Sequence, residues 1–190
     1  MKKFLFAGMG GQGILSMGRF WTESGLIEGK EVSYLPAYGP EMRGGTANCA
    51  VIISRTPIAS PLCTKPDVLI AMNAPSLHRF AKNVVPNGLI LINGNLSDGF
   101  SGRDDVRSLV LMANDLAHEA GDVRSANMVM TGALCALTGA VSERSILACL
   151  HEKFAAKPNL IGINEKAFRL GLAAADEGLK KKNARPAFAV

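Results

Sequence analysis

Aromatic residues and the side chains that build metal sites are scarce in this chain. Aromatics make up 6% of the 190 residues, and there are four cysteines and three histidines. The cysteines (Cys49, Cys63, Cys135 and Cys149) form no CxxC pair, and the histidines are scattered. This spacing supports neither a zinc site nor an iron–sulfur cluster. We therefore expect no metal site and a structural role for all four cysteines.

Long hydrophobic runs and a basic stripe are also lacking. No apolar run reaches the ~18–20 residues that span a bilayer, and the short apolar opening lacks a signal-peptide cleavage site. The net charge of +5 is concentrated near the C-terminus, at Lys180, Lys181, Lys182 and Arg185. We therefore expect a cytoplasmic protein that binds neither membranes nor nucleic acid. Residues 179–190 are predicted to be a basic tail, either solvated or in contact with a partner subunit.

Motifs for nucleophilic or acid–base catalysis are absent as well. The sequence has no GxSxG elbow, no HExxH, and no histidine near a cysteine or serine in a recognisable local motif. We predict no catalytic residue in this chain. If it takes part in catalysis, a cofactor held elsewhere supplies the chemistry.

Glycine and aliphatic residues, by contrast, are abundant: there are 20 glycines, and 48% of the residues are hydrophobic. Apolar segments of strand length alternate with segments of helical periodicity. Strands are predicted at 2–7, 31–36, 47–54, 67–72, 88–93 and 106–112. Helices are predicted at 13–28, 75–84, 113–121, 126–139, 142–155 and 163–181. This pattern predicts one α/β domain, a three-layer α/β/α, Rossmann-like fold with a mostly parallel or mixed sheet.

The most informative motif follows the first predicted strand. Residues 8–13 read Gly8-Met9-Gly10-Gly11-Gln12-Gly13, a GxGxxG pattern placed between a strand and a helix. In this context glycines allow a tight turn, and the helix N-terminus offers N–H groups to a phosphate. The motif therefore predicts either an anion or nucleotide site or a turn that needs positive φ.

A second motif lies between the second and third predicted strands. It reads Tyr38-Gly39-Pro40-Glu41-Met42-Arg43-Gly44-Gly45-Thr46. Arg43 could clamp a phosphate or carboxylate, with N–H groups from the two following glycines. Alternatively, Glu41 and Arg43 pair with each other or with solvent in a rigid loop.

Two further features bear on function. A dinucleotide site needs an acidic residue at the end of the second strand, but Glu28 and Glu31 lie before that strand or at its start, which argues against NAD. The helix predicted at 126–139 is apolar nearly all round, so it is buried either in its own core or against a partner.

The chain closely resembles the gamma subunit of 2-oxoacid:ferredoxin oxidoreductases, the pyruvate/ketoisovalerate/2-oxoglutarate oxidoreductase family. The resemblance is carried by the glycine motif at 8–14, by residues 38–45, and by segments 54–61, 66–72, 127–133 and 164–171. It covers residues 1–178, which would form one family domain and leave 179–190 as the tail.

The resemblance implies a non-catalytic subunit of an enzyme of anaerobic metabolism. The complex converts a 2-oxoacid and coenzyme A to an acyl-CoA and reduces ferredoxin. Thiamine diphosphate would lie between alpha and beta subunits, and iron–sulfur clusters on partner chains, possible delta subunits included. This chain would support assembly and handle coenzyme A. The residues expected at a CoA-proximal or inter-subunit surface are Gly8, Gly10, Gly11, Gln12, Gly13, Tyr38, Glu41, Arg43, Gly44 and Gly45.

Two alternatives stay open at this point. One is a self-contained nucleotide-binding oxidoreductase that uses the 8–13 loop. The other is a purely structural subunit, with the 126–139 helix and the 38–46 loop as its interface. The sequence does not identify the 2-oxoacid; the separately encoded type of gamma subunit that it resembles favours 2-oxoglutarate or a branched-chain acid over pyruvate.

Overall fold

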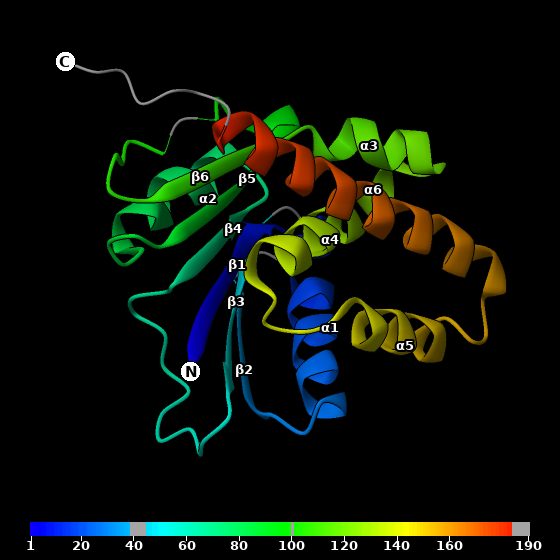
Figure 1. Ribbon diagram of the computed structural model, residues 1–190, viewed down its shortest axis with the longest axis horizontal. Helices are drawn as coiled ribbons and strands as arrows, with labels where there is room; N and C mark the ends of the chain where they lie inside the picture. The colour runs from blue at the N-terminus through cyan, green and yellow to red at the C-terminus, as the bar shows by residue number, and fades with distance from the viewer. Residues whose placement is uncertain (39–44, 100, 184–190) are drawn as a thin grey trace.

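One sheet runs through the centre of the chain, with helices on both of its faces (Figure 1). The computed structural model describes residues 1–38, 45–99 and 101–183. The strands within these ranges are β1 (Lys2–Met9), β2 (Glu31–Tyr38), β3 (Thr46–Ser54), β4 (Val68–Ala71), β5 (Leu89–Asn93) and β6 (Arg107–Leu111). The α-helices are α1 (Ile14–Ile27), α2 (Ala74–Phe80), α3 (Ala113–Ala120), α4 (Ala126–Thr138), α5 (Glu143–Lys153) and α6 (Pro158–Asn183). Short 3-10 turns are η1 (Ala81–Asn83), η2 (Gly94–Leu96) and η3 (Val123–Ser125).

The strands are arranged in the order β2-β3-β1-β4-β5-β6. β1, β4, β5 and β6 pair in parallel, whereas β3 lies antiparallel between β1 and β2. Every one of these strands except β3 therefore points the same way. Their carboxyl ends share one edge of the sheet, called here the carboxyl edge, and the opposite edge is the amino edge. The predicted α/β class with a mostly parallel or mixed sheet is confirmed.

The helices cover the two faces of the sheet unequally. One face carries α1, α3, α4, α5 and α6, whose buried side chains form a core with Phe4 and Trp21. The other face carries α2 and η1, which pack Leu77 and Ala81 against Leu5 and Leu69. The three predicted layers are present, but the second helical layer is thin.

α4 and α6 cross with their backbones in direct contact. A Cβ added at Gly132 of α4 would overlap the carbonyl oxygen of Phe168, and one added at Gly171 of α6 would overlap that of Val129. Such an approach requires residues without a side chain. α4 is buried along most of its length by this chain itself. Of the two alternatives for this apolar helix, burial in its own core is correct, so it gives no support to an interface.

The last helix differs from its prediction. It starts at Pro158, five residues before the predicted 163, and it continues to Asn183. Proline suits a first helical turn because the N–H that it lacks would have no helical partner there. The helix therefore runs past residue 178, while the division into a family domain and a basic tail stays a prediction. Residues 184–190 lie outside the described ranges.

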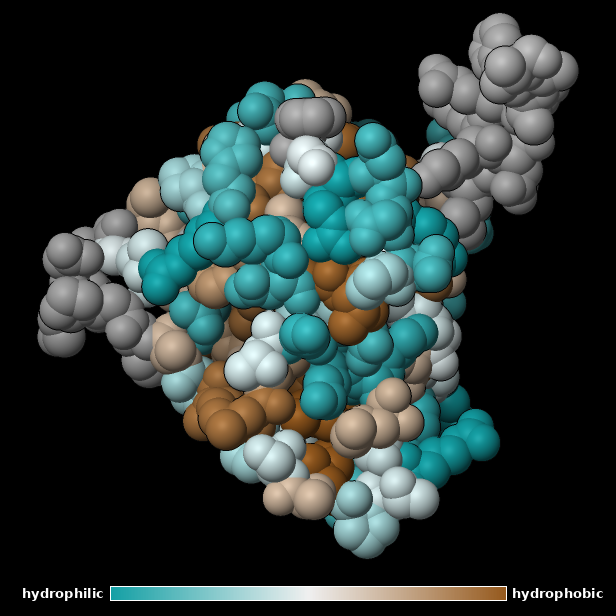
Figure 2. Space-filling model, turned by 90° about the vertical axis from the view of Figure 1, so that its left-hand side faces the viewer, coloured by the Kyte–Doolittle hydropathy of each residue, from teal (hydrophilic) through white to brown (hydrophobic). Residues whose placement is uncertain are grey.

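Three of the four cysteines are buried, which fits the structural role expected of them, whereas Cys63 is partly exposed. All are free, and Cys49, Cys135 and Cys149 are buried. Burial raises the pKa of Cys49 to about 12 and that of Cys135 to about 11, so these thiols stay protonated and unreactive at neutral pH. Within the described residues, no helix is long and apolar enough to cross a bilayer. Polar side chains dominate the face shown in Figure 2, with hydrophobic areas mainly in its lower half.

Candidate functional site

The glycine loop (residues 8–13) lies at the carboxyl edge, between the end of β1 and the start of α1. Gly11 and Gly13 have φ values of 95° and 73°, in the left-handed region that favours glycine. At Gly8 space is limited instead, since an added Cβ would overlap the ends of the Ile14 and Gln12 side chains, which would have to shift. The prediction of a turn with positive φ is confirmed, and a helix N-terminus follows it directly.

Gln12 points inward and ties the loop to the neighbouring strand. Its Oε1 accepts hydrogen bonds from the backbone N–H of Met9 (2.7 Å) and from Nδ2 of Asn73 (3.1 Å). Its Nε2 donates to the carbonyl oxygen of Met72, at 3.4 Å. Gln12 therefore fixes the loop against the neighbouring strand.

The second motif meets the glycine loop in space. The backbone N–H of Gly10 donates to the carbonyl oxygen of Gly45, at 2.9 Å. Tyr38 is the last residue of β2, and its backbone pairs with Ala47 of β3. The two motifs therefore share the carboxyl edge, as the sequence predicts. Glu41, Arg43 and Gly44 lie outside the described residues.

A cleft of about 380 Å³ opens between the glycine loop, the first turn of α1 and the start of β3. Gly13 is the N-cap of α1; it provides no side-chain hydrogen bond, and the first turn carries no acidic residue. The first N–H groups of a helix have no intrahelical partner, and the helix dipole is positive there. The residues around the cleft are Met9, Gly10, Gly11, Gly13, Ile14, Leu15, Ser16, Gly45, Thr46 and Ala47.

The described residues around this cleft suit binding rather than catalysis. None of them carries a titratable side chain, so they offer no general acid, base or nucleophile. What they offer is backbone N–H groups, the hydroxyls of Ser16 and Thr46, and the positive end of α1. This combination suits a phosphate or another anion.

The sequence did not single out a row of amide side chains along the same edge. Asn73 follows β4 and Asn93 ends β5; both are buried. Asn93 Nδ2 lies 3.0 Å from Oδ1 of Asn114, and Asn73 bonds Gln12, so the row extends from the glycine loop toward α3. A signal was present, because each asparagine comes at or just after the end of a predicted strand. Asn127 of α4 was also missed as a support of the site: its side chain packs against Gly13.

The strand order bears on the dinucleotide alternative. A Rossmann site needs the second strand beside the first, with an acidic residue at its end. Here antiparallel β3 separates β1 from β2, and Glu31 starts β2 at the amino edge. Glu28 is engaged at the far end of α1, where it accepts hydrogen bonds from Ser142 and Ser145. The described part of the chain therefore lacks the arrangement that holds a dinucleotide ribose.

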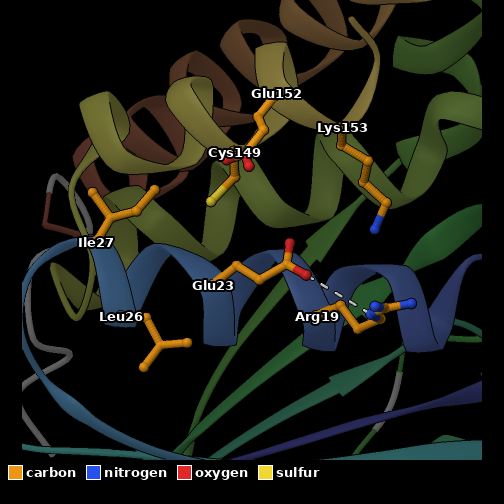
Figure 3. A pocket seen from close by; sticks show the side chains of 7 residues that line it. All are labelled: Arg19, Glu23, Leu26, Ile27, Cys149, Glu152 and Lys153. Carbon is orange, nitrogen blue, oxygen red and sulfur yellow. Dashed lines mark ion pairs between the residues drawn. The ribbon is translucent and has the colours of Figure 1, made fainter. Parts of the chain in front are cut away.

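A larger cavity, about 520 Å³, lies between α1 and α5, away from the glycine loop (Figure 3). Its charged side chains are of both signs, and two of them, Arg19 and Glu23, pair with each other at 3.8 Å. It lacks a converging set of groups, so we place the candidate site at the glycine loop. No cluster of three or more potential metal ligands occurs among the described residues.

Comparison with known proteins identifies the family. The family of pyruvate ferredoxin/flavodoxin oxidoreductases matches residues 3–174. The ketoisovalerate oxidoreductase subunit VorA of Methanothermobacter marburgensis is 41% identical over 167 residues, which are 87% of this chain and 34% of VorA. The chain thus spans about a third of that relative.

Two solved structures share the fold. The gamma subunit of a keto/oxoacid ferredoxin oxidoreductase from Geobacter sulfurreducens has a TM-score of 0.81 and 26% identity, covering 93% of this chain and 99% of that one. The 2-oxoglutarate:ferredoxin oxidoreductase from Magnetococcus marinus, solved with 2-oxoglutarate, coenzyme A and succinyl-CoA bound, has a TM-score of 0.85 and 27% identity. The aligned part makes up 93% of this chain and 32% of the Magnetococcus chain. Because the family model matches residues 3–174 and these structures share the fold, the chain belongs to the pyruvate ferredoxin/flavodoxin oxidoreductase family.

Proposed function

We propose that this chain is the gamma subunit of a heteromeric, cytoplasmic 2-oxoacid:ferredoxin oxidoreductase. The complex oxidatively decarboxylates a 2-oxoacid with coenzyme A and transfers the electrons to ferredoxin. The observation that carries the proposal is the family match over residues 3–174, which includes both the glycine loop and the α4/α6 crossing. The similarity of its fold to the Geobacter gamma subunit supports the role of a gamma subunit. The free cysteines suit a reducing compartment.

The catalytic cofactors are proposed to belong to alpha, beta and delta-type partner subunits. When bound there, thiamine diphosphate supplies the decarboxylation chemistry and iron–sulfur clusters carry the electrons. The residues of this chain do not fit such a cluster, because Cys49, Cys135 and Cys149 are buried separately and no ligand cluster forms among the described residues. Its contribution is binding and positioning.

For coenzyme A, the cleft at the glycine loop fits a phosphate group. The open N-terminus of α1 and the backbone N–H groups of the loop would bind the anion, and Ser16 and Thr46 would add hydroxyl donors. The inward hydrogen bonds of Gln12 hold the loop in place before any ligand arrives. A packing-only role for the loop is the competing interpretation.

The complex itself is tested by affinity purification of the tagged chain from its native cells under anaerobic conditions. The eluate should reduce ferredoxin or viologen in a CoA-dependent way with one class of 2-oxoacid. Partner subunits identified by mass spectrometry should accompany this activity. A tagged chain recovered alone and without activity would refute the proposal.

The role of the cleft is tested by Gly11→Ala, compared with Gly29→Ala in the same complex. A Cβ at either glycine meets no atom within 4 Å, and both have positive φ, so the two changes cost similar backbone strain. Only Gly11 borders the cleft. We expect Gly11→Ala to raise the KM for coenzyme A about tenfold, equivalent to ~1.4 kcal/mol of binding, and Gly29→Ala to leave it unchanged. Equal KM values in both variants would favour the packing-only role.

A further inference from the structure

The segment between β3 and β4 projects from the amino edge of the sheet, at the opposite end from the glycine loop (Figure 1). Residues 55–65, called here the arm, contain no helix or strand. All of them are exposed except Ile58 and Cys63, which are partly buried. Connections of this length without secondary structure are uncommon in compact domains and usually have a function.

Both ends of the arm are fixed to the sheet. At its start, the backbone N–H of Thr56 donates to Oγ of Ser54, at 3.1 Å. Just after its end, Asp67 bonds Lys3 twice, with Oδ2 accepting from the Lys3 N–H and its own N–H donating to the Lys3 carbonyl. Pro57 and Pro61 restrict the backbone between these anchors. An arm fixed in this way loses little conformational entropy when it binds.

The arm exposes an apolar side chain, that of Leu62. Leu62 is 63% exposed, more than Leu26 (58%) or Ile27 (52%), the next most exposed leucine and isoleucine. A single exposed leucine is ordinary on a protein surface. On a projecting arm with fixed ends, however, it is placed to enter a depression on another molecule.

The surface beside the start of the arm, called here the root and formed by Lys2, Lys30, Ser54, Arg55 and Thr56, is positively charged. A cleft of about 400 Å³ is lined there by Lys2, Lys30 and Arg55, together with the hydroxyls of Ser54 and Thr56, and no carboxylate lines it. Lys30 is neutralised by Glu28. Lys2 and Arg55 have no ion-pair partner among the described residues. The arm itself carries Arg55 and Lys65 and no acidic residue.

We propose that the arm and its basic root form a docking surface for another subunit of the complex. The partner would present an apolar depression for Leu62 and carboxylates for Arg55 and Lys2. Charge complementarity favours an acidic contact, because the two unpaired charges that line this cleft, those of Lys2 and Arg55, are both positive. The inference rests on the proposed function and adds the surface through which the subunit is held.

The test uses the complex purified through a tag on this chain. Leu62→Asp and Arg55→Glu should each reduce the amount of partner subunit recovered at least about tenfold, as expected for a central contact and a complementary charge. Leu96→Asp and Arg107→Glu are matched controls, because both positions are exposed and lie on other elements. These controls should retain the partners within twofold of the wild type. Unchanged melting temperatures would show that the arm variants remain folded.

The outcomes are separable. If the wild type recovers its partners and both arm variants do so equally well, the arm is not a docking surface, while the proposed function stands. If the wild type recovers no partner, the proposed function fails and this inference fails with it. Salt gives a second measurement: Arg55→Gln should make partner release less sensitive to ionic strength than in the wild type, and an identical salt dependence would contradict the ionic part of the proposal.

Discussion

The two ends of α1 are built in opposite ways. At the amino-terminal end, Gly13 provides no side-chain cap, and the first turn faces a cleft of about 380 Å³. At the carboxyl-terminal end, Glu28 accepts hydrogen bonds from Ser142, Ser145 and Lys30. One end is anchored in part by the backbone of Ser142 and the hydroxyl of Ser145, which are distant in sequence, and the other leaves backbone donors available to a ligand. The contrast shows that α1 is fixed at its carboxyl-terminal end, and it underlies the proposal that its amino-terminal end binds an anion.

The largest effect is expected at the anchored end, from Glu28→Gln. Partial burial alone would raise the pKa of Glu28, but the hydrogen bonds from Lys30, Ser142 and Ser145 outweigh it and lower the pKa from 4.5 to about 2. A lowered folded-state pKa means that the stabilisation is complete above pH about 4.5 and is lost as the pH falls toward 2. We expect the variant to lose about 2–3 kcal/mol of unfolding free energy at pH 7, measured by urea denaturation.

The pH profile provides the control for this prediction. The wild type should lose stability between pH 4.5 and 2 more steeply than Glu28→Gln. Glu23→Gln, on the same helix but in a more exposed pair with Arg19, should follow the wild-type profile closely. Parallel profiles for Glu28→Gln and the wild type would show that Glu28 does not anchor the helix.

A smaller effect should separate backbone strain from ligand binding. Gly11→Ala and Gly29→Ala lie near opposite ends of α1, with φ values of 95° and 68°. Each is expected to lower the unfolding free energy by about 1–2 kcal/mol, because an L residue is strained in this region. Similar losses in urea denaturation, combined with different KM values for coenzyme A, would confirm that the two ends differ in function. A much larger loss at Gly11 would instead indicate that the loop mainly serves folding.

The smallest effect is expected from Ser16→Glu at the third position of α1. A carboxylate there interacts favourably with the helix dipole and should raise the unfolding free energy by about 0.5 kcal/mol. The same charge would occupy the open end and repel a phosphate, so affinity for coenzyme A should fall. Ser16→Gln is the neutral control in calorimetric titration of the complex. Unchanged affinity in Ser16→Glu would place the anion elsewhere.

Local signals in the sequence predict most of the elements and the glycine loop. Each described strand lies at a predicted position, because an apolar run bounded by turn residues is a local property. The antiparallel position of β3 between β1 and β2 is not a local property, because the apolar pattern of residues 46–54 does not indicate whether the strand pairs in parallel or antiparallel. The early start of α6 was missed because Pro158 was not recognised as a first-turn residue.

The candidate site was predicted in its backbone but not in its supports. The positive φ values of Gly11 and Gly13 could be expected, because glycine is the residue type that favours them. Asn73 and Gln12 are 61 positions apart, and only the folded sheet shows that their side chains meet. The close approach at Gly132 and Gly171 was likewise hidden, since a glycine within a helix does not reveal what packs against it.

The position of β3 beside β1 has a consequence for how the chain folds. One half of the sheet comes from the continuous segment 2–54, which contains β1, β2 and β3, with α1 between β1 and β2. β2 and β3 follow one another in the sequence and pair with each other. The paired residues of β2 and β3 are 9 to 23 positions apart, and those of β4 with β5 and of β5 with β6 are 21 and 18 positions apart. β1, in contrast, pairs with β3 across 37 to 51 positions and with β4 across 64. Contacts of short sequence separation form fastest because they close the smallest loops. We expect the β2–β3 hairpin and the β4–β5–β6 unit to form early, and β1 to join them later in the middle of the sheet.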